Sequence, residues 1–128
     1  MAADTTTPNF ADIRVLLVED EPLIALDAED LLRTMGVADV VCARNVVEGM
    51  SALDGQTFHV ALLDVRLGAD SSLPVAERLA STKVPFGFMT GLRDDAIPEA
   101  FKDRPVVAKP FTRQHLVNVL GALVGQKK

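Results

Sequence analysis

Short, largely apolar runs recur along this chain, and each run gives way to polar residues before an amphipathic segment begins. The runs that we interpret as strands are IRVLLV at 13–18, DVVCA at 39–43, FHVALL at 58–63, FGFMT at 86–90 and PVVA at 105–108. Such short apolar runs are typical of strands that are buried on both faces of a parallel sheet. The alternation therefore predicts five strands, each followed by a helical crossover.

The segments between these runs carry signals for helix starts and stops. Pro22 stands where a first helical turn tolerates proline, and Asn45 followed by Glu48 resembles a capping box. Thr112 can cap a last helix. Helices are therefore predicted from Pro22 to Gly36, from Asn45 to Gly55, from Leu73 to Lys83 and from Thr112 onwards. The stretch 91–104 is rich in charge and contains Pro98, so any fourth helix there should be short and weakly held.

Five strands that alternate with helices imply an α/β domain, because parallel neighbours need long right-handed crossovers. A chain of 128 residues has room for one such domain. We expect a flavodoxin-like (βα)5 three-layer sandwich with a five-stranded parallel sheet in the order 2-1-3-4-5. The domain is placed at 12–125, after a flexible leader at 1–11 and before a short tail at 126–128.

Charge and cysteine content narrow the classes of function. The 13 basic against 18 acidic residues give a net charge of -5, which disfavours binding to nucleic acid or to anionic membranes. Cys42 is the only cysteine, so a disulfide framework within the chain is excluded, and we expect its side chain to be buried. The sequence contains neither a signal-peptide pattern nor a long apolar span, and we expect a cytoplasmic protein without a membrane partner.

Polar residues at the predicted strand ends are the candidate site. Glu19 and Asp20 end the first strand, Asp64 ends the third, Thr90 the fourth and Lys109 the fifth. In open parallel sheets, ligands bind outside the carboxyl ends of the strands, at the point where the crossovers change side. Three carboxylates gathered there repel one another, and a hard cation such as Mg²⁺, or Mn²⁺ as a substitute, relieves that repulsion.

Asp64 is the predicted nucleophile towards a phosphoryl group, because a metal-neutralised carboxylate can form an aspartyl phosphate. Lys109 and the hydroxyl of Thr90 would stabilise charge on the transferring oxygens. Taken singly, acidic residues at strand ends are more often solvated loop termini, so the signal is the joint placement of these residues. His59 and His115 stand at no evident catalytic spacing and enter no mechanism.

Four motifs in the chain, VLLVEDE, ALLDVRLG, FMTG and AKPF, resemble those of the receiver domain of bacterial two-component response regulators over 13–124. The resemblance implies that Glu19, Asp20 and Asp64 bind Mg²⁺ together with the main-chain carbonyl of Arg66. It also implies that Asp64 is phosphorylated, that Thr90 and Lys109 contact the phosphoryl group, and that the peptide bond between Lys109 and Pro110 is cis. From statistics alone, that bond would be trans.

Two departures from typical receivers stand out. Val106 occupies the place of the Tyr or Phe that usually turns inward when the threonine moves. The stretches PFGFMTG and DVRLGADSSLPVAERLA instead resemble an atypical group named for a Phe-Ala-Thr-Gly signature, with Met89 in place of the alanine. Resemblance to that group implies a stand-alone domain that pairs with sensor histidine kinases of the HWE type.

The predicted function is a single-domain response regulator in a phosphorelay, which takes a phosphoryl group from a sensor histidine kinase onto Asp64. It would signal to an unidentified downstream protein or serve as a phosphate sink, and it would not be an enzyme beyond its own Mg²⁺-dependent phosphorylation and dephosphorylation. One alternative is a receiver-like interaction module that is never phosphorylated. A phosphatase of the haloacid-dehalogenase type would need a second Asp two residues after Asp64, where this chain has Arg66.

Overall fold

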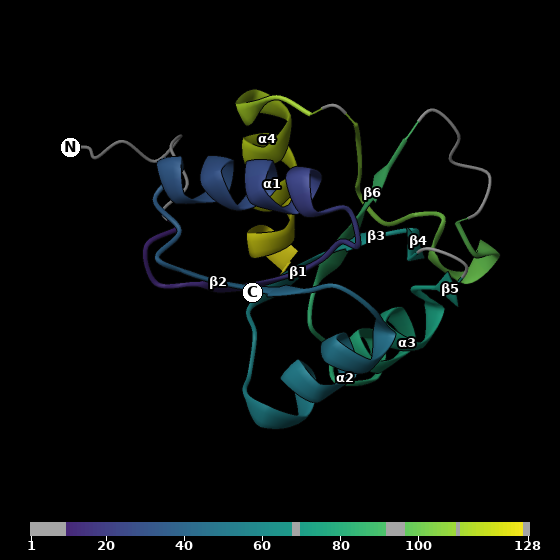
Figure 1. The fold of residues 1–128 in the computed structure, drawn as a ribbon. Coiled ribbons are helices and arrows are strands. Elements are labelled where there is room, and N and C mark those ends of the chain that lie inside the picture. Colours follow the sequence, from purple (N-terminus) through teal and green to yellow (C-terminus); the bar gives the residue numbers. More distant parts are fainter. Residues whose placement is uncertain (1–9, 68–69, 92–96, 110, 127–128) are drawn as a thin grey trace.

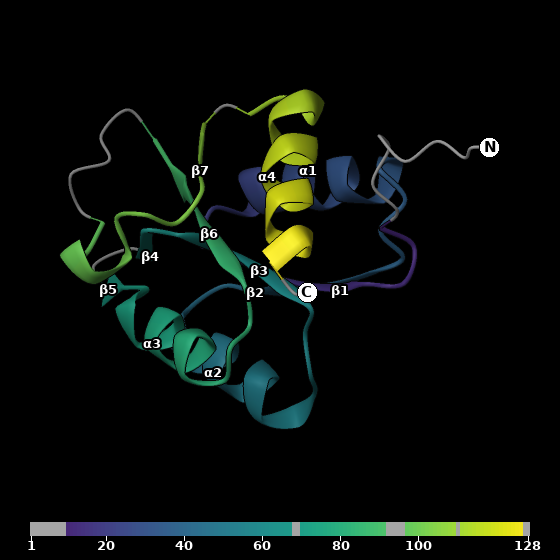
Figure 2. The same cartoon turned by 180° about the vertical axis from the view of Figure 1, so that it is seen from behind.

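The computed structural model describes residues 10–67, 70–91, 97–109 and 111–126. A parallel sheet forms the middle layer, with α1 and α4 on one face and α2 and α3 on the other (Figures 1 and 2). None of the helices in these ranges has the length and apolar character needed to cross a membrane. The strands of this sheet are β1 Arg14–Val18, β2 Asp39–Ala43, β3 Val60–Asp64, β6 Phe86–Thr90 and β7 Val106–Ala108, and the α-helices are α1 Pro22–Thr34, α2 Val46–Gly55, α3 Leu73–Ser81 and α4 Arg113–Gln126.

The sheet has the strand order β2-β1-β3-β6-β7, and all of its pairings are parallel. Numbered by their order in the chain, these five strands run 2-1-3-4-5, so the predicted flavodoxin-like fold is confirmed. The crossovers change side between β1 and β3, since α1 covers one face and α2 the other. The carboxyl ends of these two strands therefore flank the point where this fold class binds its ligands.

Alternation along each strand divides the core between the two faces of the sheet. In β1, Val15 and Leu17 pack with α1 and α4, while Leu16 and Val18 pack with α2 and α3. All five residues of β3 are buried. Burial on both faces explains why the sequence shows continuous apolar runs rather than an alternation of apolar and polar residues.

The predicted helix caps are present. The side chain of Asn45 accepts a hydrogen bond from the backbone N–H of Glu48 at 2.8 Å, and Thr112 Oγ1 accepts one from His115 N–H at 3.2 Å. The carboxylate of Glu48 accepts in turn from the N–H of Arg44 at 2.8 Å, one residue before the cap. The bonds donated by the N–H groups of Glu48 and His115 satisfy donors that the first turn of a helix leaves without partners.

Between β6 and β7, the described part of the chain contains only a three-residue 3₁₀ helix, η1 Glu99–Phe101. This agrees with the expected short fourth helix, although residues 92–96 of the predicted segment lie outside the described ranges. Phe101 holds η1 against the sheet, with ring centroids 5.4 Å from Phe86 and 6.5 Å from Phe88. These contacts between aromatic rings fix η1 on the sheet.

Two local features differ from expectation. The chain after β3 forms a small antiparallel hairpin, β4 Arg66–Leu67 with β5 Asp70–Ser71, which the sequence did not predict. The prediction that Cys42 is buried is wrong, because its side chain is exposed on an edge strand that lacks a neighbour on one flank. Partial burial, and next a hydrogen bond to Glu29, raise the pKa of the Cys42 thiol to about 11.

Candidate functional site

The register of the sheet brings the predicted site residues to one edge. Val18 pairs with Leu63, so the residues that follow β1 lie beside Asp64, the last residue of β3. Glu19 continues the line of β1, since its N–H donates to the carbonyl of Ala43 at 3.0 Å. Parallel strands that end in register therefore place these carboxylates together without any contact in sequence.

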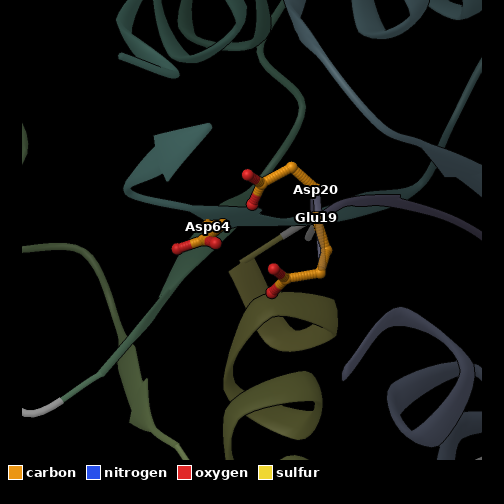
Figure 3. A group of neighbouring side chains, drawn as sticks. All are labelled: Glu19, Asp20 and Asp64. Atoms are coloured by element: carbon orange, nitrogen blue, oxygen red, sulfur yellow. The ribbon is translucent and has the colours of Figure 1, made fainter. Parts of the chain in front are cut away.

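Three carboxylates form the centre of the site. One oxygen each from Glu19, Asp20 and Asp64 lies within 4.8 Å of the other two. Figure 3 shows the three side chains clustered where β1 and β3 end. Glu19 and Asp64 are buried, and Asp20 is half-buried. Like charges held this close in a setting that excludes water raise the energy of the ionised cluster.

Lys109 supplies the positive charge of the cluster. Its Nζ lies 2.9 Å from Glu19 Oε1 and 3.0 Å from Asp64 Oδ2, and only 14% of its side chain is exposed. The backbone N–H of Lys109 donates to the carbonyl of Thr90 at 2.7 Å, which ties the end of β7 to the end of β6. The lysine is thus positioned by the sheet as well as by its ion pairs.

Charge in the cluster is only partly balanced. Burial raises the pKa of Glu19 to about 7; the contact with Lys109 acts against this, and the nearby Asp64 offsets that contact. Burial lowers the pKa of Lys109, but its contacts with Glu19 and Asp64 outweigh that effect and raise it overall. Three acidic groups facing one ammonium group leave the site anionic.

One buried atom points to a further cation. Glu19 Oε1 has no partner with hydrogen-bond geometry among the described residues, even though Lys109 Nζ lies 2.9 Å away. A buried carboxylate oxygen without a hydrogen bond is costly, and carboxylate oxygens are the ligands that Mg²⁺ prefers. The donor set of Glu19, Asp20 and Asp64 therefore fits a hard divalent cation.

Thr90 and Arg66 are the remaining predicted site residues, and Val106 lies on the strand that precedes Lys109. Thr90 is buried at the end of β6, one residue after Met89, which pairs with Asp64. Arg66 begins β4 with an exposed side chain. Val106 is 39% exposed on β7. The peptide bond between Lys109 and Pro110 falls outside the described residues, because Pro110 is one of those not described.

Sequence reasoning missed Ser72, a residue that holds the turn after Asp64 in place through hydrogen bonds. Ser72 is buried, and both its N–H and its hydroxyl lie 3.2 Å from the carbonyl of Val65. Val65 in turn donates its N–H to Met89 O at 3.3 Å, so the turn after Asp64 is held to both β6 and the start of α3. The only sequence signal for this role of Ser72 was its place directly before a helix with proline in the first turn.

Comparisons with known proteins agree on one family. Residues 15–121 match the response regulator receiver domain. The solution structure of SdrG from Sphingomonas melonis Fr1 is 41% identical with a TM-score of 0.80, over 89% of this chain and 98% of SdrG. A solution structure of the BeF3-activated conformation of SdrG from Pseudomonas melonis Fr1 is 39% identical with a TM-score of 0.76, over 91% of this chain and 98% of that one.

A longer curated relative matches over part of its length. The phyllosphere-induced regulator PhyR of Methylorubrum extorquens is 34% identical in an alignment 120 residues long, which covers 87% of this chain. The chain spans 41% of the length of PhyR.

Proposed function

This chain belongs to the response regulator receiver domain family, whose members are signalling domains rather than enzymes, and we propose that Asp64 is its phosphoryl acceptor. The observation that carries the proposal is the setting of the Asp64 carboxylate. Its Oδ2 lies 3.0 Å from Lys109 Nζ, and the carboxylate shares a cluster with Glu19 and Asp20. A carboxylate held among cation-binding groups at the end of a parallel strand is suited to accept a phosphoryl group.

The donor would be a phosphohistidine of a sensor kinase. An oxygen of Asp64 attacks the phosphorus atom, a P–O bond forms and the P–N bond breaks, and the electron pair of that bond stays on the imidazole nitrogen of the donor. No oxidant is needed, and a proton from water completes the imidazole. In this step, Lys109 exchanges its contact with the Asp64 carboxylate for a contact with a phosphoryl oxygen.

Mg²⁺ is the proposed cofactor, with Mn²⁺ as a substitute. Glu19, Asp20 and Asp64 would hold it, together with the main-chain carbonyl of Arg66. When bound, it would neutralise charge on the carboxylates and on the phosphoryl oxygens. Glu19 and Asp20 would serve only to hold the cation. Asp64, which stands alone at the end of its strand, would in addition react with the phosphoryl group.

Thr90 is the proposed hydrogen-bond donor to the phosphoryl group. It is buried at the end of β6 and shares a backbone hydrogen bond with Lys109, so a movement of either residue is passed to the other. The usual partner of such a threonine is an aromatic side chain in the last strand. In this chain Val106 has only a small apolar side chain. We therefore expect that the structural change caused by phosphorylation reaches the surface through residues other than Val106.

The relatives support a role in signalling between proteins. BeF3⁻ mimics a phosphoryl group on a carboxylate, so the activated SdrG structure is consistent with a phosphoryl acceptor in this chain as well. We place the chain in the cytoplasm, downstream of a sensor histidine kinase of the HWE type and in the receiver group with the Phe-Ala-Thr-Gly signature. Its output would be binding to another protein or removal of phosphoryl groups from the kinase.

The test is intact-mass spectrometry after incubation with a small phosphodonor and Mg²⁺. Wild-type protein should gain one phosphoryl group, and Asp64→Asn protein or a chelator should prevent the gain. Asp12→Asn is the matched control, because Asp12 is an exposed acid before β1, at the opposite edge of the sheet. If neither small donors nor candidate kinases phosphorylate the wild type, the proposal gives way to the interaction module that is never phosphorylated.

A further inference from the structure

A cationic surface lies at the edge of the sheet opposite the carboxylate cluster. Two adjacent cavities of about 300 and 230 Å³ meet there at Lys83 and Val84. Arg78 lines the larger cavity and Arg104 the smaller one, and none of the acidic residues that the structure describes lines either of them. We call this the Lys83 surface. It stands out on a chain whose net charge is -5.

Lys83 stands in a conformation that glycine adopts more easily. Its φ of 63° is the one positive value among the non-glycine residues that the structure describes. It ends α3 in a Schellman motif, with its own N–H donating to Ala80 O at 3.2 Å and the N–H of Val84 donating to Leu79 O at 2.9 Å. Glycine is the least strained residue at such a position. A lysine in this conformation is an outlier against local preference, which favours a role for its side chain.

One of the three cations of this surface is in an ion pair, and for the other two no ion pair is found among the described residues. Arg78 forms an ion pair with Asp54. The guanidinium of Arg104 lies 4.4 Å from the centre of the Phe86 ring and 5.6 Å from that of Phe101, which fixes its position without neutralising it. No ion pair of Lys83 is found in the described part of the chain. Two cations, one of them already ordered, therefore remain available to a ligand.

The larger cavity carries apolar walls beside these cations. Leu53, Phe58 and Val84 line the larger cavity. Pockets for whole small molecules usually span about 300–1,000 Å³, and these cavities lie at or below the lower end of that range, which suits a single side chain. The combination of an apolar hollow with two available cations is complementary to a peptide in which an apolar side chain stands among carboxylates.

We propose that the Lys83 surface binds an acidic peptide segment of a partner protein, with an apolar side chain of that segment seated in the larger cavity. Nucleic acids and anionic membranes fit less well, because the chain as a whole would repel their dense negative charge. Both cavities lie before β3 and β6, whereas Asp64 and Thr90 end these strands. Figure 2 shows the connection from α3 into β6, at the end of β6 opposite its arrowhead.

The separation from the phosphoryl site has a functional consequence. β6 spans five residues, so the two edges lie about 17 Å apart at the usual rise per residue. A segment bound at the Lys83 surface leaves Asp64 accessible to a kinase. The partner would therefore hold the domain in place through both states of a phosphorylation cycle.

The probe is a short fluorescein-labelled peptide in which one leucine is flanked on both sides by aspartates and glutamates. We expect unphosphorylated wild-type protein to bind it, with amide NMR shifts confined to residues lining the two cavities. Lys83→Glu should weaken the affinity about tenfold or more, since a like charge then faces the peptide. Lys83→Gly, which is not expected to disturb the fold, should weaken it to a smaller extent.

Arg113→Glu is the matched control, because Arg113 is exposed at the start of α4, on the other face of the sheet. It should leave the affinity unchanged. Equal binding of a peptide with asparagine and glutamine in place of the acids would overturn the proposal, as would wild-type affinity in both Lys83 variants. Binding to phosphatidylglycerol vesicles without binding to the peptide would assign the surface to membranes instead. The assay uses no phosphoryl group, so its outcome is independent of the role of Asp64.

Discussion

At the carboxyl ends of the strands, two buried carboxylates of the cluster share the ammonium group of Lys109, whereas at the amino ends Arg14 and Asp39 form an exposed pair. Lys109 contacts Glu19 and Asp64 with side-chain exposures of 14%, 0% and 12%. At the other edge, the side chains of Arg14 and Asp39 lie 2.6 Å apart and are 36% and 48% exposed. Buried charge without full compensation stores energy that a ligand can release, while exposed pairs contribute little.

We call the strand ends that carry the carboxylate cluster the carboxyl edge, and the opposite strand ends the amino edge. The largest expected effect on stability follows from removing Lys109, the cation of the carboxyl edge. Lys109→Met should lower the free energy of unfolding by about 3 kcal/mol without added metal, because Glu19 and Asp64 would then face each other uncompensated. Urea unfolding followed by circular dichroism measures this, and added Mg²⁺ should recover part of the loss. Lys83→Met is the control at the amino edge. A loss below about 1 kcal/mol for Lys109→Met would mean that the carboxylates are better solvated than their burial indicates.

Adding metal should stabilise the carboxyl edge alone. With Mg²⁺ at about a hundred times its dissociation constant, the free energy of unfolding should rise by about 2.7 kcal/mol, and a chelator should reverse the rise. Thermal unfolding with and without Mg²⁺ is the measurement. Asp20→Asn should reduce the increase, and Asp12→Asn, at the other end of β1, should not. Equal increases in all three proteins would indicate non-specific ion binding.

A substitution at the amino edge should have a smaller effect than Lys109→Met, and of the opposite sign. Lys83→Gly should raise the free energy of unfolding by about 0.5–1 kcal/mol, because the relief of left-handed strain exceeds the added entropy of the unfolded chain. Chemical denaturation at equal salt detects a change of this size. A destabilised variant would show that the lysine side chain contributes more to the fold than its exposed position suggests.

The smallest effect is expected at an exposed pair. Asp39→Asn should change the free energy of unfolding by less than about 0.5 kcal/mol, because water and salt screen its attraction to Arg14. Repeating the unfolding curve at high salt should remove even this difference. If Asp39→Asn lowered the free energy of unfolding by more than about 1 kcal/mol, charge pairs at the amino edge would not be weaker than those at the carboxyl edge.

Several elements could be predicted from the sequence because local signals agree with the final packing. The strands at 39–43 and 86–90 have the predicted bounds, since turn-forming or charged residues flank each apolar run. The predicted strand at 58–63 is instead Val60–Asp64. Phe58 is 4% exposed without being part of the strand, and Asp64 belongs to the strand although it is charged. Burial and strand pairing are separate properties, and apolar patterns report mainly on burial.

Other features depend on contacts that no local pattern records. The β4–β5 hairpin has only two residues in each strand, too few for a periodic signal. Exposure of Cys42 follows from the place of β2 at the edge of the sheet, which is a property of strand order. The left-handed conformation of Lys83 could not be predicted, because glycine rather than lysine is the usual signal for such a helix end.

The sequence by itself determined the parallel α/β fold and the identity of the residues at the strand ends, because continuous apolar runs and their polar stops are local properties. Only the tertiary structure decided how those residues meet. Strand register brought Glu19, Asp20 and Asp64 within 4.8 Å of one another and placed Lys109 between two of them. Distances across a sheet are set by pairing between segments far apart in the chain, and these distances determine how strongly the charges interact.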